Sequence, residues 1–306
     1  MNKIKLYEML QAGFDRKQQE PPHVGGDWRG GNSGCITEDG VIVGASPRTA
    51  VLRHMGIEIP PTLDDDLIFD AGFRNEDHWM ELLKFAGVPV KAESDIPVAW
   101  SLPNGQTITG RPDLVVMNDD DTPRFGIELK LISSNGKMKR HSHFGDANPI
   151  AYQVCQAAHY SSKMGVDWVL AYTSRCHFTS FYWRGDGWKF QHRAMMMDDK
   201  GTKPVSVAPF ISMYDIGWDG DTCLVDGKPT IITASGIERF YQYCSDCVRD
   251  GIIPPHEDNV DIWGVKEKKE SASVLYDDFA EARTDMGFET WIEDCKLIAE
   301  VRRGRE

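Results

Sequence analysis

The stretch of residues 110–132 constrains the fold more than any other part of the sequence. It holds two apolar runs, 114–117 and 125–132, separated by the turn-forming residues NDDDTPR. Short runs rich in Val, Ile and Phe and bounded by Asn, Asp and Pro are typical of β-strands. Because the connection between them is short, the two strands can pair with each other through this turn.

Three charged side chains accompany these strands. Asp113 opens the first strand, and Glu128 and Lys130 lie two residues apart on the second. Side chains alternate across a strand, so Glu128 and Lys130 share one face, and pairing would bring Asp113 beside it. Two carboxylates and a backbone carbonyl suit Mg²⁺, and a nearby ammonium can orient or help to deprotonate a water that attacks a phosphodiester. An E-x-K triplet also recurs by chance on solvated strands, but charges seldom interrupt an apolar strand without serving a site.

The rest of the chain alternates between helical and extended patterns. Apolar spacing, N-terminal Pro or Ser and C-terminal Gly predict helices at 3–19, 47–56, 75–86 and 149–164. Strands are expected at 88–100, 106–108, 168–174 and 177–184, with a hairpin turn at DGWK and a loop at PPTLDDDLIF. This order predicts an α/β protein in three parts. They are an N-terminal helix with a Gly/Pro-rich segment (1–45), the core with a cysteine-containing part (46–265) and a charged helical tail (266–306).

The charge is strongly acidic, with 47 Asp and Glu against 34 Lys and Arg and a formal net charge of −13. This excess argues against a protein that coats nucleic acid through bulk charge. Basic side chains nevertheless gather in the loop after the second strand, where the phosphates of DNA would pass, and one lies near the core; the loop can equally serve solubility. The expected DNA-binding residues are Lys137, Lys139, Arg140 and Arg48.

No apolar run reaches the roughly 18–20 residues that a membrane span needs. The N-terminus also lacks the long apolar region of a secretory signal. We therefore expect a cytoplasmic protein with no membrane partner.

On its charged residues the chain resembles the PD-(D/E)XK nuclease superfamily. Asp113 matches the first strand carboxylate of that superfamily, and Glu128 and Lys130 match its E-x-K motif. The resemblance covers about residues 46–185 and implies a restriction-endonuclease-like core, in which helices flank a central mixed β-sheet. It also implies hydrolysis of phosphodiesters with Mg²⁺ or Mn²⁺, where both carboxylates hold the metal and Lys130 positions the water.

Further motifs are similar to those of RecB-type and lambda-exonuclease-type nucleases. Those families carry a Gly followed four residues later by His or Glu on a helix upstream of the acidic strand. Gly72 and Glu76 match that step, and His78 is the alternative if the register differs. The resemblance implies that Glu76 or His78 is a further metal ligand.

The helix after the E-x-K strand contains QAAHY, which is similar to the Q-x-x-x-Y motif of RecB-type nucleases. Gln156 and Tyr160 lie four residues apart and would share one helix face, and Gln153 is a nearby alternative. By the resemblance Gln156 and Tyr160 contact the nucleic-acid backbone or support the site. Taken without the strand motif, the same spacing would indicate only a half-buried amphipathic helix.

Seven cysteines occur without an export signal, so a disulfide framework is not expected. Many RecB-type nucleases, notably CRISPR-associated exonucleases, hold a 4Fe–4S cluster with one cysteine before the core and three after it. By this resemblance Cys35, Cys244 and Cys247 are ligands of a cluster. The fourth ligand stays open among Cys223, Cys295 and His256. Zinc would suit a Cys and His set equally well, and the plain alternative is buried thiols at a helix end.

The resemblance implies a metal-dependent DNA exonuclease of recombination, repair or phage DNA metabolism. DNA would be its partner, and proteins of recombination or CRISPR adaptation would be further partners. Two alternatives stay open. One is a site-specific or structure-specific endonuclease of the same fold, and the other is a nucleic-acid-binding adaptor whose catalytic site is unused.

Overall fold

The computed structural model describes most of the central part of the chain. The described residues are 28–55, 63–92, 95–96, 98–132, 149–174, 180–184, 187–191, 196–197, 204–205, 211–256 and 259–266, together with 9 and 12. The expected helix at 3–19, the basic loop after the E-x-K strand and the tail after residue 266 lie outside these residues.

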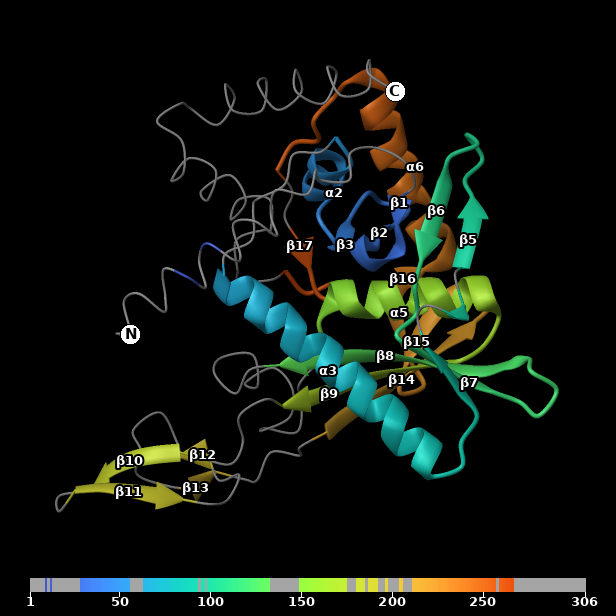
Figure 1. Ribbon diagram of the computed structural model, residues 1–306. Coiled ribbons are helices and arrows are strands. Elements are labelled where there is room, and N and C mark those ends of the chain that lie inside the picture. The colour runs from blue at the N-terminus through green and yellow to red at the C-terminus, as the bar shows by residue number, and fades with distance from the viewer. Residues whose placement is uncertain are drawn as a thin grey trace.

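A seven-stranded mixed β-sheet forms the centre of the protein, with the strand order β16-β15-β14-β9-β8-β7-β4 (Figure 1). The strands β8 and β9 are parallel, and the other neighbours are antiparallel. In chain order the strands are β4 (Val90–Ala92), β7 (Leu114–Met117), β8 (Pro123–Ile132), β9 (Trp168–Ser174), β14 (Ile211–Asp219), β15 (Thr222–Val225) and β16 (Lys228–Thr233).

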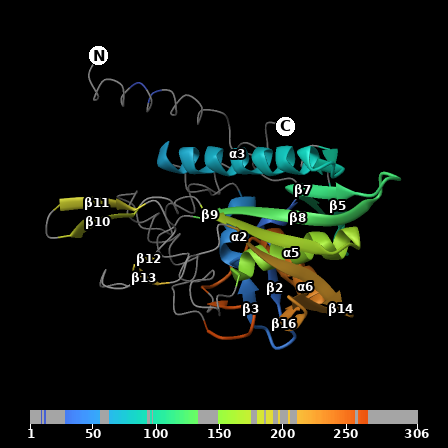
Figure 2. The same cartoon turned by 90° about the horizontal axis from the view of Figure 1, so that it is seen from below.

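Helices cover both faces of this sheet, so the protein has the expected α/β architecture. The helix α3 (Leu63–Phe85) lies on one face and α5 (Ala151–Met164) on the other (Figure 2). On the α3 face, Trp79 packs on a small apolar cluster from β7, β8 and β9, and its Nε1 donates to Thr173 Oγ1 at 3.1 Å. None of the described helices has the length and apolar character needed to cross a membrane.

The larger core lies on the α5 face and includes the N-terminal described residues. There α6 (Ala234–Asp250) and α2 (Pro47–His54) pack beside α5 and two small sheets. The side chains of Trp28 and Cys35 belong to this core. Residues 28–44 therefore contribute side chains to this core. The small sheets and hairpins comprise β1 (Trp28–Arg29), β2 (Gly34–Ile36), β3 (Ile42–Gly44), β5 (Val98–Ser101), β6 (Thr107–Gly110), β10 (Ser180–Arg184), β11 (Gly187–Gln191), β12 (Met196–Met197), β13 (Pro204–Val205) and β17 (Asn259–Val260).

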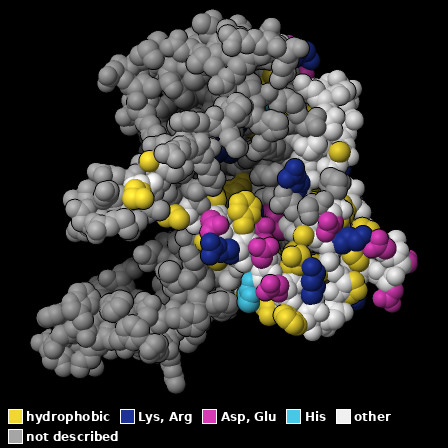
Figure 3. Space-filling model, viewed as in Figure 1, with side chains coloured by type: hydrophobic (Ala, Val, Ile, Leu, Met, Phe, Trp, Pro, Cys, Tyr) yellow, Lys and Arg dark blue, Asp and Glu magenta, His cyan; other side chains and the backbone are white. Residues whose placement is uncertain are grey.

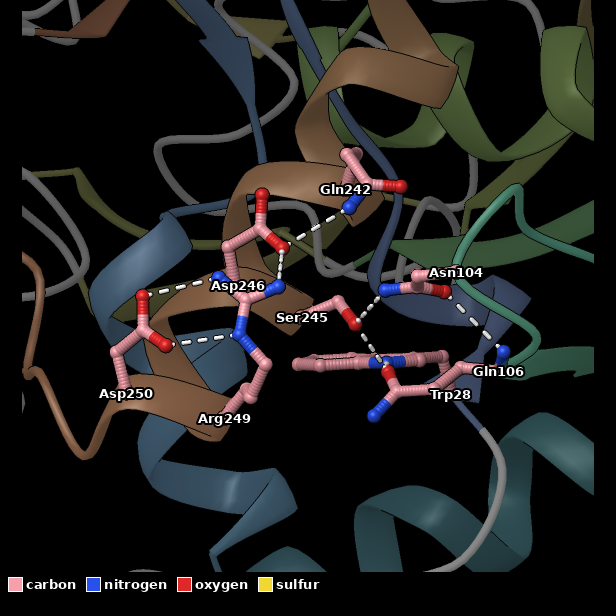
Figure 4. A network of polar contacts seen from close by, with 8 residues as sticks. All are labelled: Trp28, Asn104, Gln106, Gln242, Ser245, Asp246, Arg249 and Asp250. Carbon is pink, nitrogen blue, oxygen red and sulfur yellow. Dashed lines mark hydrogen bonds and ion pairs between the residues drawn. The ribbon is translucent and has the colours of Figure 1, made fainter.

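A polar network joins three of these separate segments (Figure 4). The indole Nε1 of Trp28 donates to Gln106 Oε1 at 2.7 Å, and Asn104 Nδ2 donates to Ser245 Oγ at 2.5 Å. The Ser245 hydroxyl in turn donates to Gln106, and the ring of Trp28 stacks on His54 with centroids 4.0 Å apart. The network thereby connects β1, the β5–β6 turn and α6 on the side of the core away from the large sheet.

Several expected elements are confirmed, and others begin or end elsewhere. The helix after Ser46 is present, and the Ser46 hydroxyl accepts the N–H of Thr49 at 3.3 Å as an N-cap. The expected loop at 60–69 is wrong from Leu63 onward, because α3 begins there. The acidic run 64–66 stands in the first turn of that helix, where the helix dipole favours negative charge. The single strand expected at 88–100 is divided between two sheets as β4 and β5.

The contact between Gly126 and Trp168 gives a test of this arrangement. These residues are partners in the parallel β8–β9 pair, and a Cβ atom on Gly126 would overlap the indole ring of the buried Trp168. We expect Gly126→Ala to lower the free energy of unfolding by about 1–3 kcal/mol in urea denaturation, as overpacked cores do.

A matched control is Gly72→Ala in α3, where the added methyl group meets no atom within 4 Å. Because Ala is a better helix former, this variant should gain about 0.5–1 kcal/mol. Equal stability of Gly126→Ala and wild type would contradict the close packing of β8 on Trp168.

Candidate active site

The pairing of β7 with β8 places Asp113 beside the E-x-K strand. Leu114 is the partner of Ile127 in this antiparallel pair, so the residue before Leu114 lies across from Glu128. Asp113 is fixed there because its Oδ2 accepts the backbone N–H of Leu129 at 2.7 Å. The strand pairing and the position of Asp113 that the sequence predicts are therefore confirmed.

Glu128 and Lys130 occupy the α5 face of β8. Their neighbours Ile127 and Leu129 belong to the apolar cluster on the α3 face, so the alternation along the strand is as expected. The side chain of Glu128 is fully buried, and its Oε1 accepts a hydrogen bond from Lys130 Nζ. The other oxygen, Oε2, is also buried and has no hydrogen-bond partner among the described residues.

The pKa values of both Glu128 and Lys130 are shifted from their ordinary values, and Asp113 contributes to both shifts. Burial, and after it the nearby Asp113, raise the pKa of Glu128 to about 8 against the opposing effect of Lys130. Burial alone lowers the pKa of Lys130, but the carboxylates of Glu128 and Asp113 outweigh it and raise this pKa above its ordinary value. The lysine is therefore held charged, while the buried Glu128 needs either a proton or a further positive charge nearby.

The helix α5 brings Gln156 and Tyr160 to the same side of the sheet. Both side chains are buried, and they are hydrogen-bonded to each other. Burial raises the pKa of Tyr160, and the nearby carboxylate of Glu128 raises it further. A Cβ atom on Gly30 would lie 2.9 Å from the Tyr160 ring, and one on Gly110 would overlap it. The ring is thus wedged between the η1 turn (Gly30–Asn32) and β6.

On α3 the structure distinguishes between the two alternatives that the sequence left open. Glu76 is half-buried and lies three and four residues before Trp79 and Met80, which pack on the sheet. Its carboxylate is close enough to Glu128 to contribute to the raised pKa of that residue. His78 is exposed. Glu76 therefore lies within electrostatic reach of Glu128, whereas His78 is exposed.

Two tyrosines beside Lys130 were not among the predicted site residues. Tyr172 is the β9 partner of Lys130 in the parallel pair, and its hydroxyl donates to Gln153 Oε1 at 2.7 Å. Gln153 Nε2 donates to the hydroxyl of Tyr152 at 3.1 Å. The sequence offered Gln153 only as an alternative to Gln156. The position of Tyr172 opposite Lys130 depends on the β8–β9 register, which the sequence does not specify.

The carboxylates fit a hard divalent cation. Within the described ranges no three His, Cys, Asp or Glu residues gather closely enough to hold a metal ion by themselves. Mg²⁺ commonly needs only one or two protein carboxylates, with water and substrate phosphate as its other ligands. The buried Oε2 of Glu128 and the neighbouring Asp113 supply such a pair, with Glu76 near it.

The cysteines predicted as cluster or zinc ligands do not form one set. Cys35 lies against Gly236 in the first turn of α6, whereas Cys244 lies eight residues further along that helix, about 12 Å at 1.5 Å per residue. Cys247 follows one turn after Cys244. Over the part of the chain that the structure describes, these thiols are separated, so no step is assigned to a cluster.

Cys35 lies instead within electrostatic reach of Cys155 and Cys223, and all three thiols are buried. Burial raises the pKa of each of them, which favours neutral core thiols. Of the other candidates, His256 is exposed, and Cys295 lies outside the described residues. An iron–sulfur or zinc site stays a prediction.

The expected DNA-binding residues are placed less fully. Lys137, Lys139 and Arg140 lie outside the described residues. Arg48, which was expected near the core as a DNA-binding residue, is buried, and its Nη1 donates to the carbonyl of Pro254 at 2.9 Å. On the face shown in Figure 3, acidic, basic and hydrophobic side chains are interspersed over the described surface.

Comparison with known proteins adds little to this site. No family model matches the chain, and no curated protein matches it. Among solved structures, one described as "Crystal structure of SSO0001" is similar at a TM-score of 0.37 and 14% identity. The match covers 79% of this chain and 86% of the other. A likeness at this level bears on neither the fold nor the function of this protein.

The raised pKa of Glu128 predicts a pH dependence of stability. An unfolded Glu titrates near its ordinary pKa of 4.5, so between that value and about 8 the folded protein binds more protons than the unfolded one. Stability should therefore fall as the pH rises through this window, by at most about 1.4 kcal/mol per pH unit. Glu128→Gln removes this titration, so the variant should gain stability relative to wild type between pH 5 and pH 9.

Urea denaturation at pH 5, 7 and 9 without divalent cations would measure this difference. A difference between wild type and Glu128→Gln that stays constant over these pH values would contradict the assigned electrostatics. The exposed Glu81→Gln variant in α3 is the matched control, and its difference from wild type should vary much less with pH.

Proposed function

We propose that the protein is a metal-dependent DNA exonuclease that hydrolyses phosphodiester bonds at the Asp113, Glu128 and Lys130 site. The observation that carries this proposal is the fully buried Glu128, whose Oε1 accepts from Lys130 while Oε2 has no hydrogen-bond partner among the described residues. A buried carboxylate oxygen without a hydrogen bond is costly unless a ligand completes it. A divalent cation fits that need, and the nearby lysine suits phosphate chemistry.

In this proposal the carboxylates bind the metal and Lys130 positions the water or the phosphate. Asp113 and Glu128 would hold Mg²⁺ or Mn²⁺. Glu76 does not gather with them closely enough to form a set of three ligands among the described residues, so its role as a metal ligand stays a prediction from the sequence. When bound, the metal would lower the pKa of a water and stabilise the negative charge that develops on the phosphoryl oxygens. Lys130 stays protonated beside Glu128, so its ammonium can donate to the attacking water or to the phosphate and fix its position.

Gln156 and Tyr160 are better placed to support the site than to contact DNA at its surface. Both are buried, and the Tyr160 ring fills the space between Gly30 and Gly110. Their role would be to keep α5 at a fixed distance from β8. Contacts with the DNA backbone through Lys137, Lys139 and Arg140 stay a prediction from the sequence, as do roles in recombination, repair or phage DNA metabolism.

A second candidate function is an endonuclease of the same fold. The site chemistry is the same for both, and the difference is whether the enzyme needs a free end. Product analysis on linear and circular DNA, labelled at 5′ and 3′ ends, separates the two and gives the polarity. An adaptor with an unused site would cut neither substrate.

The proposal predicts a specific loss of activity. Labelled linear DNA incubated with Mg²⁺ or Mn²⁺ should be degraded by wild type, and Lys130→Ala should slow single-turnover cleavage at least about a hundredfold. The matched control is Lys163→Ala at the other end of α5. Lys163 pairs with Glu238 at 2.5 Å, away from the carboxylate site, so its loss should leave the rate within about twofold.

Two results would speak against the nuclease proposal. One is a wild-type protein that cuts neither linear nor circular DNA with either metal. The other is a Lys130→Ala variant that cuts as fast as Lys163→Ala.

A further inference from the structure

The hydrogen bonds beside Lys130 form a chain that runs in one direction, from the backbone to Tyr152. The backbone N–H of Ile150 can only donate, and it donates to the Tyr172 hydroxyl at 3.2 Å. The single phenolic proton of Tyr172 then goes to Gln153 Oε1 at 2.7 Å. The NH₂ group of Gln153 points outward, where Nε2 donates to the Tyr152 hydroxyl at 3.1 Å. In this arrangement the amide oxygen faces Tyr172 and the amide nitrogen faces Tyr152.

This direction decides what Tyr152 can do. Its hydroxyl oxygen already accepts from Gln153, so its own proton is available for an acceptor elsewhere. Over the described part of the chain the Tyr152 hydroxyl donates to no acceptor. The chain also runs from the core to the surface, because Tyr172 is 1% exposed, Gln153 5% and Tyr152 41%. The Tyr152 hydroxyl is therefore a hydrogen-bond donor at the exposed end of a chain of hydrogen bonds whose other members are buried.

The donor is presented on the face of the sheet that carries the candidate active site. Tyr172 is the direct β9 partner of Lys130, and Glu128 lies on the same face of β8. Tyr152 is in the first turn of α5, and it lies close enough to Lys130 for the two side chains to interact electrostatically. A phosphate bound at Glu128 and Lys130 would lie within the neighbourhood of this hydroxyl.

We propose that Tyr152 contacts the substrate and donates its phenolic proton as a hydrogen bond to a non-bridging oxygen of the scissile phosphate. This inference rests on the proposed nuclease function. It adds a phosphate-binding residue outside the carboxylate and lysine set and outside the Q-x-x-x-Y pair. Gln153 and Tyr172 are then positioning residues, which act by fixing the direction of the Tyr152 proton.

Single-turnover cleavage of labelled DNA with Mn²⁺ tests the contact directly. Three substrates carry oxygen, an Rp phosphorothioate or an Sp phosphorothioate at the bond that is cut. Tyr152→Phe should cut the oxygen substrate about tenfold to a hundredfold more slowly than wild type, the size expected for a hydrogen bond to a charged group. Sulfur accepts hydrogen bonds poorly, so this penalty should disappear for one diastereomer and persist for the other.

Two controls separate this contact from a loss of structure. The thermal unfolding midpoint of Tyr152→Phe should fall by no more than about 4 °C, because the substitution removes one hydrogen bond, from Gln153 Nε2 to a partly exposed hydroxyl. Tyr243→Phe removes the hydroxyl of another half-exposed tyrosine, on α6, and should cut all three substrates at wild-type rates.

The outcomes distinguish the two proposals. If wild type cuts DNA and Tyr152→Phe cuts it equally fast, or loses the same factor on all three substrates, the Tyr152 contact is wrong while the nuclease function stands. If wild type cuts none of the substrates, the nuclease function is wrong and the Tyr152 contact is wrong with it.

Discussion

The burial of Glu128 in the middle of the sheet is the constraint on which the rest of the site depends. A carboxylate without water around it must have a proton, a cation or strong hydrogen bonds. Here Oε1 of Glu128 accepts a hydrogen bond from Lys130, and Oε2 accepts none from the described residues. Asp113 adds a second negative group, and its Oδ2 is held by the backbone N–H of Leu129. Such an arrangement is costly in an apolar strand, and binding a cation would offset the cost.

Close packing on the α5 side keeps this geometry in place. Tyr160 fills the space between two glycines, and the Tyr172–Gln153–Tyr152 hydrogen bonds join β9 to α5 beside Lys130. On the opposite face, α3 packs through Trp79 and carries Glu76 within electrostatic reach of Glu128. Parts of the chain far apart in sequence thus converge on one strand, which is how a fold can hold charged groups where water is scarce.

The local part of the site could be predicted from the sequence, because it depends on short-range rules. The hairpin turn and the alternation along a strand were enough to place Asp113, Glu128 and Lys130 on one face. The parallel β8–β9 register could not be predicted, since the connection between these strands carries no register signal, and with it Tyr172 was missed. Helix α3 was predicted too short because residues 63–69 were interpreted as part of a loop, whereas acidic residues are favoured in the first turn of a helix by its dipole. Arg48 was expected to bind DNA, and nothing in its local sequence shows that its guanidinium donates instead to the carbonyl of Pro254.

The most direct test of the central claim is calorimetric titration of the wild-type protein with Mg²⁺ or Mn²⁺ at pH 7, in buffers with different ionisation enthalpies. With Glu128 titrating at about 8, binding of the ion should release roughly one proton. Glu128→Gln should bind much more weakly and release none. Saturable binding that is the same in both proteins, or no binding to wild type at all, would contradict the account of a metal-dependent site built on Glu128.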